Sequence, residues 1–367
     1  MDESPSAPRL ASAWQALVAL VVCLALWTAL AAPILERNAS AGPLGARRTA
    51  ALAVLRPVVA VSDALAITVV SESVERALGR DPDAPPGGVL VLPDLDLPEL
   101  DLPAEDPRTI SPGPDDRPSG SVDPNPSTGG GGGSQGGPED PVRMRVPTPG
   151  NKLRVAVIGD SLSQGLGPQI QHWMDTDVAR VLSLGRQSTG LSRQDYFNWQ
   201  AGMRQIVDEF RPDLVFVMLG SNDGQAQISR DGGAIPVGSV EWVEGYRERA
   251  ADLLQEATRA GTRVVWVGIP VVRPHQRWDF YRRVNDIYRD TARADPFGTF
   301  VDTWSAFEAR DGGYSAYVRN ERGVLQEMRA PDGIHFTPTG YGYLGRLAIR
   351  AAADAFGLSQ RAVTFRL

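Results

Sequence analysis

Hydrophobic and polar positions follow one regular pattern after residue 152. Short apolar runs alternate with stretches in which apolar residues recur every three or four positions. The apolar runs predict strands at residues 153–158, 179–184, 214–219, 263–267 and 299–301. The periodic stretches predict helices near residues 163–174, 196–210, 240–260, 277–294 and 338–356.

Apolar strands that alternate with helices indicate an α/β fold in which helices cover both faces of a parallel sheet. We therefore expect one three-layer α/β/α domain over residues 151–367. Ligands of such sheets bind at the carboxyl ends of the strands. The polar residues that follow the predicted strands are thus the first candidates for a functional site.

The first apolar segment, residues 10–35, carries no charged residue. About 20 apolar residues are enough to cross a bilayer as a helix, so residues 1–36 predict a transmembrane anchor. A cleavable signal peptide is the alternative, because Ala29 and Ala31 form a small-x-small site. The length of the apolar segment favours the uncleaved anchor.

Arginines are more frequent after this segment than before it, which disagrees with a simple positive-inside orientation. A single span followed by a polar spacer and a globular unit nevertheless favours the cell membrane as the location. In that arrangement the C-terminal domain lies on the extracytoplasmic side.

Two further segments separate the anchor from the domain. Residues 37–80 predict a membrane-proximal amphipathic helical segment, and Arg56, Pro57 and Asp63 argue against a second span. Residues 81–150 are rich in proline and glycine, and positions 81–141 hold 13 acidic and 2 basic residues of a chain with net charge −7. This composition buries too little apolar surface to fold, so we expect a disordered acidic linker. For the linker's repeat "LPDLDLPELDLPAEDP", a docking peptide is the alternative to a plain spacer.

Composition also excludes several classes of function. No cluster of lysine and arginine with interleaved aromatic residues is present, so nucleic acid is not an expected partner. The single cysteine, Cys23, lies in the apolar segment and excludes an intrachain disulfide or a thiolate metal site. The three histidines lack metal-ligand spacing and no cofactor fingerprint is complete, so we expect no metal and no cofactor. Nothing in the sequence indicates the oligomeric state.

Ser161 directly follows the first predicted strand, and a helix begins within two or three residues. The dipole at a helix N-terminus favours the negative charge that develops on an attacking serine and on an oxyanion. A simple N-cap is the alternative for a serine at this junction. Phosphate binding by the glycine-rich stretch at residues 165–167 is a weaker one.

Two other strand ends offer donors for an oxyanion. Asn222 can direct its amide N–H toward the same edge of the sheet, with an Asx turn as the alternative, and Asp223 beside it would support the turn. Gly190 follows the second strand and can bring its backbone N–H close to a bound oxygen because it has no side chain.

A serine nucleophile needs a base, which must come from three histidines. His172 is predicted on the first helix, in a surface or packing role, and His275 follows the fourth strand without a nearby acid. His335 has Asp332 three residues before it. This spacing lets the carboxylate hold Nδ1 and leaves Nε2 free to take a serine proton. A capped turn beside an exposed histidine is the alternative for this pair taken alone.

Taken together, these motifs resemble the SGNH, or GDSL, hydrolase superfamily. "GDSLS" at 159–163, the glycine of "STGLS" at 190, "GSND" at 220–223 and "DGIH" at 332–335 follow the order of its four blocks. The stretches "GLSRQDYFNW" and "DGIHFTPTGY" look like its bacterial membrane-anchored subgroup, known as a domain of unknown function (DUF459-like). The resemblance covers residues 153 to about 356 and implies a flavodoxin-like SGNH hydrolase fold.

The resemblance also implies roles for five residues. Ser161 is the nucleophile and Asp332 with His335 completes a catalytic triad. The backbone N–H groups of Ser161 and Gly190 and the side chain of Asn222 form the oxyanion hole. We therefore expect a serine esterase, an O-deacylase or O-deacetylase, that forms an acyl-enzyme on Ser161. Its expected substrate is an ester-bearing small molecule or a cell-envelope glycan.

Two other functions stay open. The same triad would serve an O-acyltransferase, whose acceptor would bind near Trp278, Tyr281 or Trp304. A non-catalytic glycan-binding surface domain would require that the four motifs occur together without chemistry. Arg273, His275 and Trp278, after the fourth strand, are possible substrate contacts, with a solvated loop as the alternative.

Overall fold

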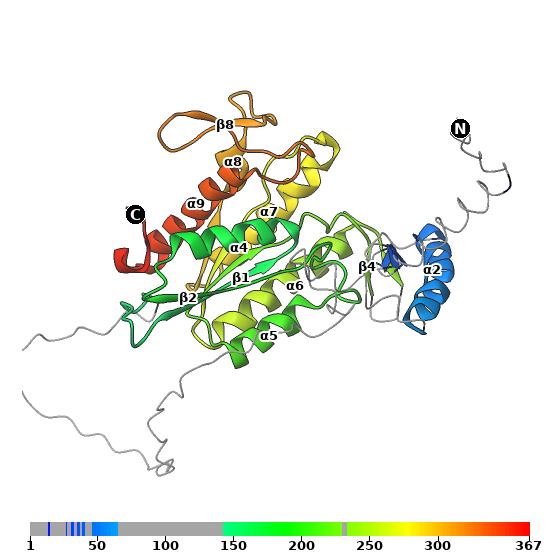
Figure 1. The fold of residues 1–367 in the computed structure, drawn as a ribbon, viewed down its shortest axis with the longest axis horizontal. Helices are drawn as coiled ribbons and strands as arrows, with labels where there is room; N and C mark the ends of the chain where they lie inside the picture. Colours follow the sequence, from blue (N-terminus) through cyan, green and yellow to red (C-terminus); the bar gives the residue numbers. More distant parts are fainter. Residues whose placement is uncertain are drawn as a thin grey trace, which may run out of the picture. The chain divides into compact units, whose positions relative to one another are not determined.

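The computed structural model describes residues 46–64, 142–229 and 233–367, with residues 14, 27, 31–32, 35–36 and 39–40. A five-stranded parallel sheet forms the centre of the C-terminal domain, in the order β2-β1-β3-β6-β7 (Figure 1). Its strands are β1 (Leu153–Gly159), β2 (Ala179–Gly185), β3 (Leu214–Met218), β6 (Arg263–Val267) and β7 (Gly298–Val301). This order is the flavodoxin-like one. The predicted strands and their parallel arrangement are confirmed, with ends that differ by one residue.

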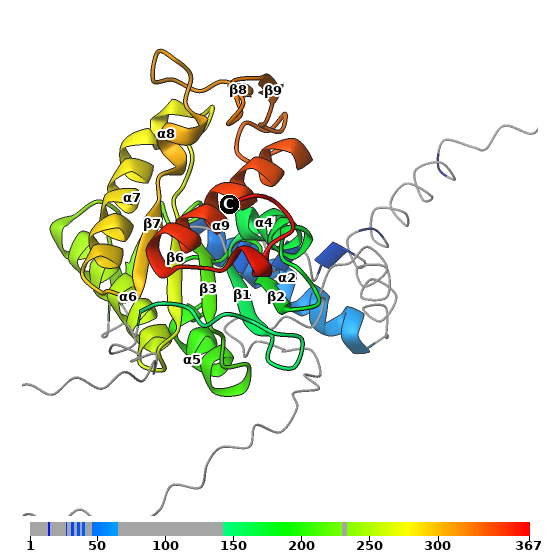
Figure 2. The same ribbon diagram turned by 90° about the vertical axis from the view of Figure 1, so that its left-hand side faces the viewer.

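Helices cover both faces of the sheet, as the sequence predicts. α4 (Ser161–Trp173) and α9 (Pro338–Phe356) pack together on one face (Figure 2). α5 (Trp199–Glu209), α6 (Val240–Thr258) and α7 (Trp278–Arg293) cover the other face. The result is a three-layer α/β/α sandwich.

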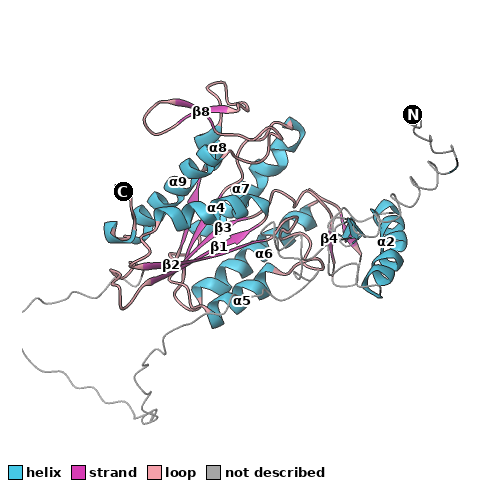
Figure 3. Ribbon diagram, in the orientation of Figure 1, coloured by secondary structure: helices cyan, strands magenta, loops and turns pink. Residues whose placement is uncertain are grey.

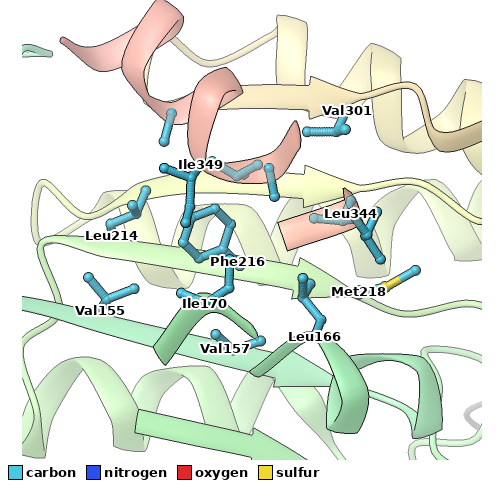
Figure 4. Packing of buried hydrophobic residues seen from close by; sticks show 14 of the residues in the cluster. Val155, Val157, Leu166, Ile170, Leu214, Phe216, Met218, Val301, Leu344 and Ile349 are labelled. Carbon is cyan, nitrogen blue, oxygen red and sulfur yellow. The ribbon is translucent and has the colours of Figure 1, made fainter. Parts of the chain in front are cut away.

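The core between the sheet and the first helical layer follows from simple spacing. Leu166 and Ile170 are four residues apart on α4, so both side chains point to the sheet. Strand residues two apart, such as Val155 and Val157, share the face that these helical residues cover (Figure 4). Phe216 of β3 lies at the centre of this cluster and is fully buried.

The structure adds short elements that the sequence analysis does not predict. They are β4 (Gln227–Ile228), β5 (Ala234–Ile235), α8 (Thr303–Phe307), β8 (Tyr317–Arg319), β9 (Leu325–Glu327), and the 3₁₀ helices η1 (His275–Arg277) and η2 (Gln360–Ala362). β8 and β9 pair as an antiparallel hairpin that lies away from the sheet (Figure 3). Strands of two or three residues are too short to show a period along the chain.

The domain begins before the predicted boundary at residue 151. Met144 is buried in the core, and its N–H donates to the carbonyl of Phe356 at 2.7 Å. Arg145 forms an ion pair with Asp213 at 3.0 Å, just before β3. Residues 142–150 are therefore part of the domain, and the predicted linker is shorter than expected.

The N-terminal predictions fall mostly outside the described residues. Helix α2 (Ala46–Ala64) lies within the predicted helical segment and contains Pro57. The predicted anchor is described only at a few positions, and the remaining linker, residues 81–141, is not described. None of the described helices is long and apolar enough to cross a bilayer.

Replacing Phe216 by alanine should lower the free energy of unfolding by about 3–5 kcal/mol, because a fully buried aromatic side chain leaves a cavity. Urea denaturation measures this difference. Val240→Ala, at a position that is 75% exposed, is the control and should change stability by less than about 0.5 kcal/mol. Equal effects of the two substitutions would contradict the assignment of this core.

Candidate active site

Ser161 is placed by the end of β1 and the start of α4. The side chain of Asp160 caps the helix, and Ser161 is the first helical residue. β1 lies between β2 and β3 in the sheet, so the loops that follow β2 and β3 flank the loop that carries Ser161. Those two loops contain Gly190 and Asn222. All three residues therefore lie at the same edge of the sheet.

Ser161, His335 and Asp332 form a continuous chain of hydrogen bonds. His335 Nε2 lies 2.9 Å from Ser161 Oγ, and His335 Nδ1 lies 2.6 Å from Asp332 Oδ2. The serine and the histidine are 174 residues apart in the sequence. They meet because the loop before α9 reaches the carboxyl edge of the sheet, where α4 begins. The His335 side chain is 36% exposed, so a ligand can reach it.

Asp332 organises its own loop as well as the imidazole. Its Oδ1 accepts hydrogen bonds from the N–H groups of Ile334 at 2.8 Å and His335 at 3.0 Å. Partial burial acts to raise the pKa of Asp332, but the hydrogen bonds from the His335 ring and from these N–H groups outweigh it and lower the pKa to about 2. The carboxylate is thus ionised at neutral pH and favours a proton on Nδ1, which leaves Nε2 as the acceptor for the serine proton.

The three expected oxyanion donors are free to bind a ligand. Within the described residues, no acceptor binds the N–H of Ser161 or of Gly190. The side chain of Asn222 donates one N–H to the carbonyl of Thr189 at 3.0 Å, which holds it beside Gly190. An amide has two N–H groups, so the second one remains for a ligand.

Asp160 joins the loop after β1 to the loop after β3. Its Oδ1 accepts the N–H of Leu162 at 3.0 Å, and its Oδ2 accepts both the N–H and the hydroxyl of Ser221 at 3.0 and 2.7 Å. Complete burial raises the pKa of Asp160 to about 6, and these hydrogen bonds oppose the shift. The motifs in the sequence do not predict this role of Asp160, although its place before the helix is a typical N-cap signal.

Asp223 joins the loop after β3 to the loop after β2. It accepts the N–H groups of Leu191 at 3.0 Å and Ser192 at 2.7 Å, and the hydroxyl of Tyr246 at 2.7 Å. Burial raises the pKa of this carboxyl. A Cβ at Gly190 would lie 2.2 Å from Asp223 Oδ1. The absence of a side chain at Gly190 is therefore required for the contact that fixes its loop.

Arg329 supports the histidine loop from within the protein. Its guanidinium is fully buried and donates to the carbonyls of Ile334 at 2.7 Å, His335 at 3.4 Å and Val271. Burial lowers the pKa of Arg329 to about 10. No sequence signal indicates this role, because an arginine in a loop is normally exposed.

The predicted substrate contacts have different environments. Arg273 and His275 are exposed, whereas the indole N–H of Trp278 donates to the carbonyl of Val272 at 2.7 Å. Tyr281 and Trp304, which could have bound an acceptor, are only 1% and 7% exposed. His172 lies on the surface of α4, with its ring against Trp173. No three metal-binding side chains cluster within the described ranges.

Comparisons with known proteins agree with the motifs. The family described as "Protein of unknown function (DUF459)" matches residues 154–351. The resemblance to this family that the motifs indicate is therefore confirmed. A search of the curated proteins finds no match.

Three solved structures illustrate the structural similarity. A catalytic mutant of an acetylxylan esterase from Geobacillus stearothermophilus is 17% identical with a TM-score of 0.40, over 59% of this chain and 98% of that one. The C-terminal catalytic domain of a Streptococcus pneumoniae peptidoglycan O-acetyltransferase is 14% identical with a TM-score of 0.38, over 56% and 94%. TesA is 19% identical with a TM-score of 0.38, over 55% and 99%. Similarities of this size transfer neither a substrate nor a reaction to this chain.

The stability that Asp160 contributes should decrease as the pH rises. Its pKa of about 6 in the folded chain lies above the ordinary value of 3.8, so its contribution is full below pH 3.8 and is lost as the pH rises through 6. The free energy of unfolding of the wild type, minus that of Asp160→Asn, should fall by about 2–3 kcal/mol between about pH 4 and pH 7. Urea denaturation across this range measures it, with the exposed Asp177→Asn as the control for a lost charge. A constant difference would contradict the burial of this carboxylate.

Asp332 should show the opposite dependence. Its folded pKa of about 2 lies below the ordinary 3.8, so its contribution is present above pH 3.8 and is lost as the pH falls through 2. The stability difference between wild type and Asp332→Asn should therefore shrink on acidification from about pH 4 to pH 2. The same denaturation experiment detects this change. A difference that grows on acidification would show that the Asp332 carboxylate lacks the hydrogen bonds described above.

Proposed function

This chain belongs to the DUF459 family, and we propose that it is a serine esterase that removes acyl groups from an ester through an acyl-enzyme on Ser161. The observation that carries the proposal is the alignment of Ser161 Oγ, the two ring nitrogens of His335 and Asp332 Oδ2, at 2.9 and 2.6 Å. A histidine held in this way takes the proton of the serine as the serine attacks a carbonyl.

In the acylation step, Ser161 Oγ forms a bond to the ester carbonyl carbon while its proton moves to His335 Nε2. The carbonyl oxygen becomes negative and accepts hydrogen bonds from the N–H groups of Ser161 and Gly190 and from Asn222 Nδ2. The tetrahedral intermediate then breaks its bond to the alcohol, which leaves with the proton from Nε2. Asp332 stays ionised throughout, because its pKa is about 2.

In the deacylation step, water replaces the alcohol. His335 takes a proton from the water as the water oxygen attacks the acyl carbonyl. The bond to Ser161 Oγ then breaks, Oγ regains its proton from Nε2, and the free acid leaves. The oxyanion donors act again, because the intermediate has the same shape and charge.

Two of the three aromatic side chains that could hold a sugar acceptor, Tyr281 and Trp304, are buried, and this favours hydrolysis over transfer. These aromatic side chains are not available to hold a second substrate. A purely binding function would not require the chain of hydrogen bonds from Ser161 through His335 to Asp332. The hydrogen-bonded triad therefore favours a catalytic protein.

An ester in the cell envelope is the substrate we propose within this function, and an O-acetylated glycan is one such ester. The support comes from the sequence alone, through the predicted membrane span of residues 10–35. An extracytoplasmic domain on such an anchor would meet envelope polymers.

Ser161→Ala should lower hydrolysis of 4-nitrophenyl acetate by the full-length chain by about 10³-fold or more in kcat, because it removes the hydroxyl that forms the proposed acyl-enzyme. Absorbance at 400 nm gives the rate, and mass spectrometry of acid-quenched protein detects an acyl group on Ser161 in the wild type. Thr176→Ala removes an exposed hydroxyl at the opposite edge of the sheet and should keep wild-type rates. Undiminished turnover by a folded Ser161→Ala protein would refute the assignment of the nucleophile.

A further inference from the structure

The loop between β6 and α7, residues 268–277, is basic. Its only charged or titratable side chains are Arg273, His275 and Arg277, and all three are exposed. The loop follows a strand at its carboxyl end, so it lies at the same edge of the sheet as Ser161. The mechanism described above uses none of these three side chains.

Arg277 is linked by hydrogen bonds to the loop that carries the oxyanion donor Asn222. Its Nη1 donates to the hydroxyl of Tyr281 at 3.2 Å, and that hydroxyl donates to the carbonyl of Ser221 at 2.9 Å. Ser221 directly precedes Asn222 in the chain. Two hydrogen bonds therefore separate the Arg277 guanidinium from the backbone that positions the Asn222 donor.

Arg273 is linked by hydrogen bonds to the loop that carries Asp332 and His335. Its backbone N–H donates to the carbonyl of Gly333 at 2.9 Å, and its side-chain Nη1 donates to the carbonyl of Pro331 at 2.8 Å. These two acceptors lie on either side of Asp332. One loop thus carries two guanidinium groups, one beside each half of the site.

Neither guanidinium is neutralised by the part of the chain that the structure describes. No carboxylate there lies within ion-pair distance of Arg273 or Arg277. Asp332 is engaged by His335, and the carboxylates of Asp160 and Asp223 are buried under their own hydrogen bonds. A guanidinium has five N–H donors, and Arg277 uses one of them. The remaining donors suit two oxygens of one anionic group.

We propose, on the basis of the proposed esterase function, that the natural ester carries an anionic oxygen group near its scissile bond and that Arg277 binds this group. A carboxylate or a phosphate supplies the required pair of oxygens. Arg273 adds positive potential on the other side of the site, which attracts the same substrate. Arg277 is thus a specificity-determining residue.

The test compares pairs of esters that differ by one negative charge. Mono-4-nitrophenyl succinate and 4-nitrophenyl butyrate place the charge on the acyl part, and 4-acetoxybenzoate and its methyl ester place it on the alcohol part. The full-length wild type should favour the anionic member of at least one pair by about tenfold in kcat/KM. Arg277→Gln should bring this ratio close to one, chiefly through KM, and Arg277→Lys should keep part of it.

Arg361→Gln is the matched control, because Arg361 is an exposed arginine in η2 near the opposite edge of the sheet. It removes the same charge and should leave both the ratio and the rates unchanged. Added salt should reduce the wild-type ratio of the two kcat/KM values. At 0.1 M ionic strength the attraction between exposed charges decays over about 10 Å. A wild-type ratio near one in both pairs, or a ratio that Arg277→Gln leaves unchanged, overturns the proposal.

Failure of the esterase function would give a different result. If the wild type hydrolyses none of the four esters, calorimetric titration of Ser161→Ala with the same esters still tests anion recognition. Tighter binding of an anionic member that Arg277→Gln abolishes supports the role of Arg277 even then. Equal binding of anionic and neutral members refutes it.

Discussion

The hydrogen bonds that Asp160 and Asp223 accept hold three separate loops at one edge of the sheet. Asp160 takes the N–H and hydroxyl of Ser221, and Asp223 takes the N–H groups of Leu191 and Ser192. A loop has few regular backbone partners, and buried N–H groups without acceptors would destabilise it. Each carboxylate belongs to one loop and accepts hydrogen bonds from the N–H groups of a neighbouring loop. These hydrogen bonds keep the spacing between the loops fixed. The positions of Ser161, Gly190 and Asn222 depend on this spacing.

The histidine side of the site is built differently. Asp332 shapes its turn through contacts two and three residues along the chain, and such short-range contacts are visible in the sequence. The turn is then fixed to the domain by Arg329, whose donors reach the carbonyls of Ile334 and Val271. A buried cation that donates to three carbonyl oxygens is a rigid support, because its removal would leave those oxygens without donors in a dry environment.

The difference between these two supports explains what the sequence could reveal. The five strands, the covering helices and the Ser161, His335 and Asp332 set follow from local patterns and from the resemblance of ordered motifs. The burial of Asp160 and the role of Arg329 depend on contacts between residues 61 and 58 positions apart, which no local pattern shows. The start of the domain at residue 142 was also missed, because a single buried Met144 leaves no periodic signal in a proline-rich region.

The positions of the two ends of the domain determine where a polymer or another protein can be attached to it. The chain enters beside Asp213 and the end of α9, and it finishes beside Asp175, near the start of β2. Both ends lie at the amino edge of the sheet, whereas Ser161 lies at the carboxyl edge. A polymer or fused protein joined where the chain enters the domain would therefore attach on the side of the sheet opposite to Ser161.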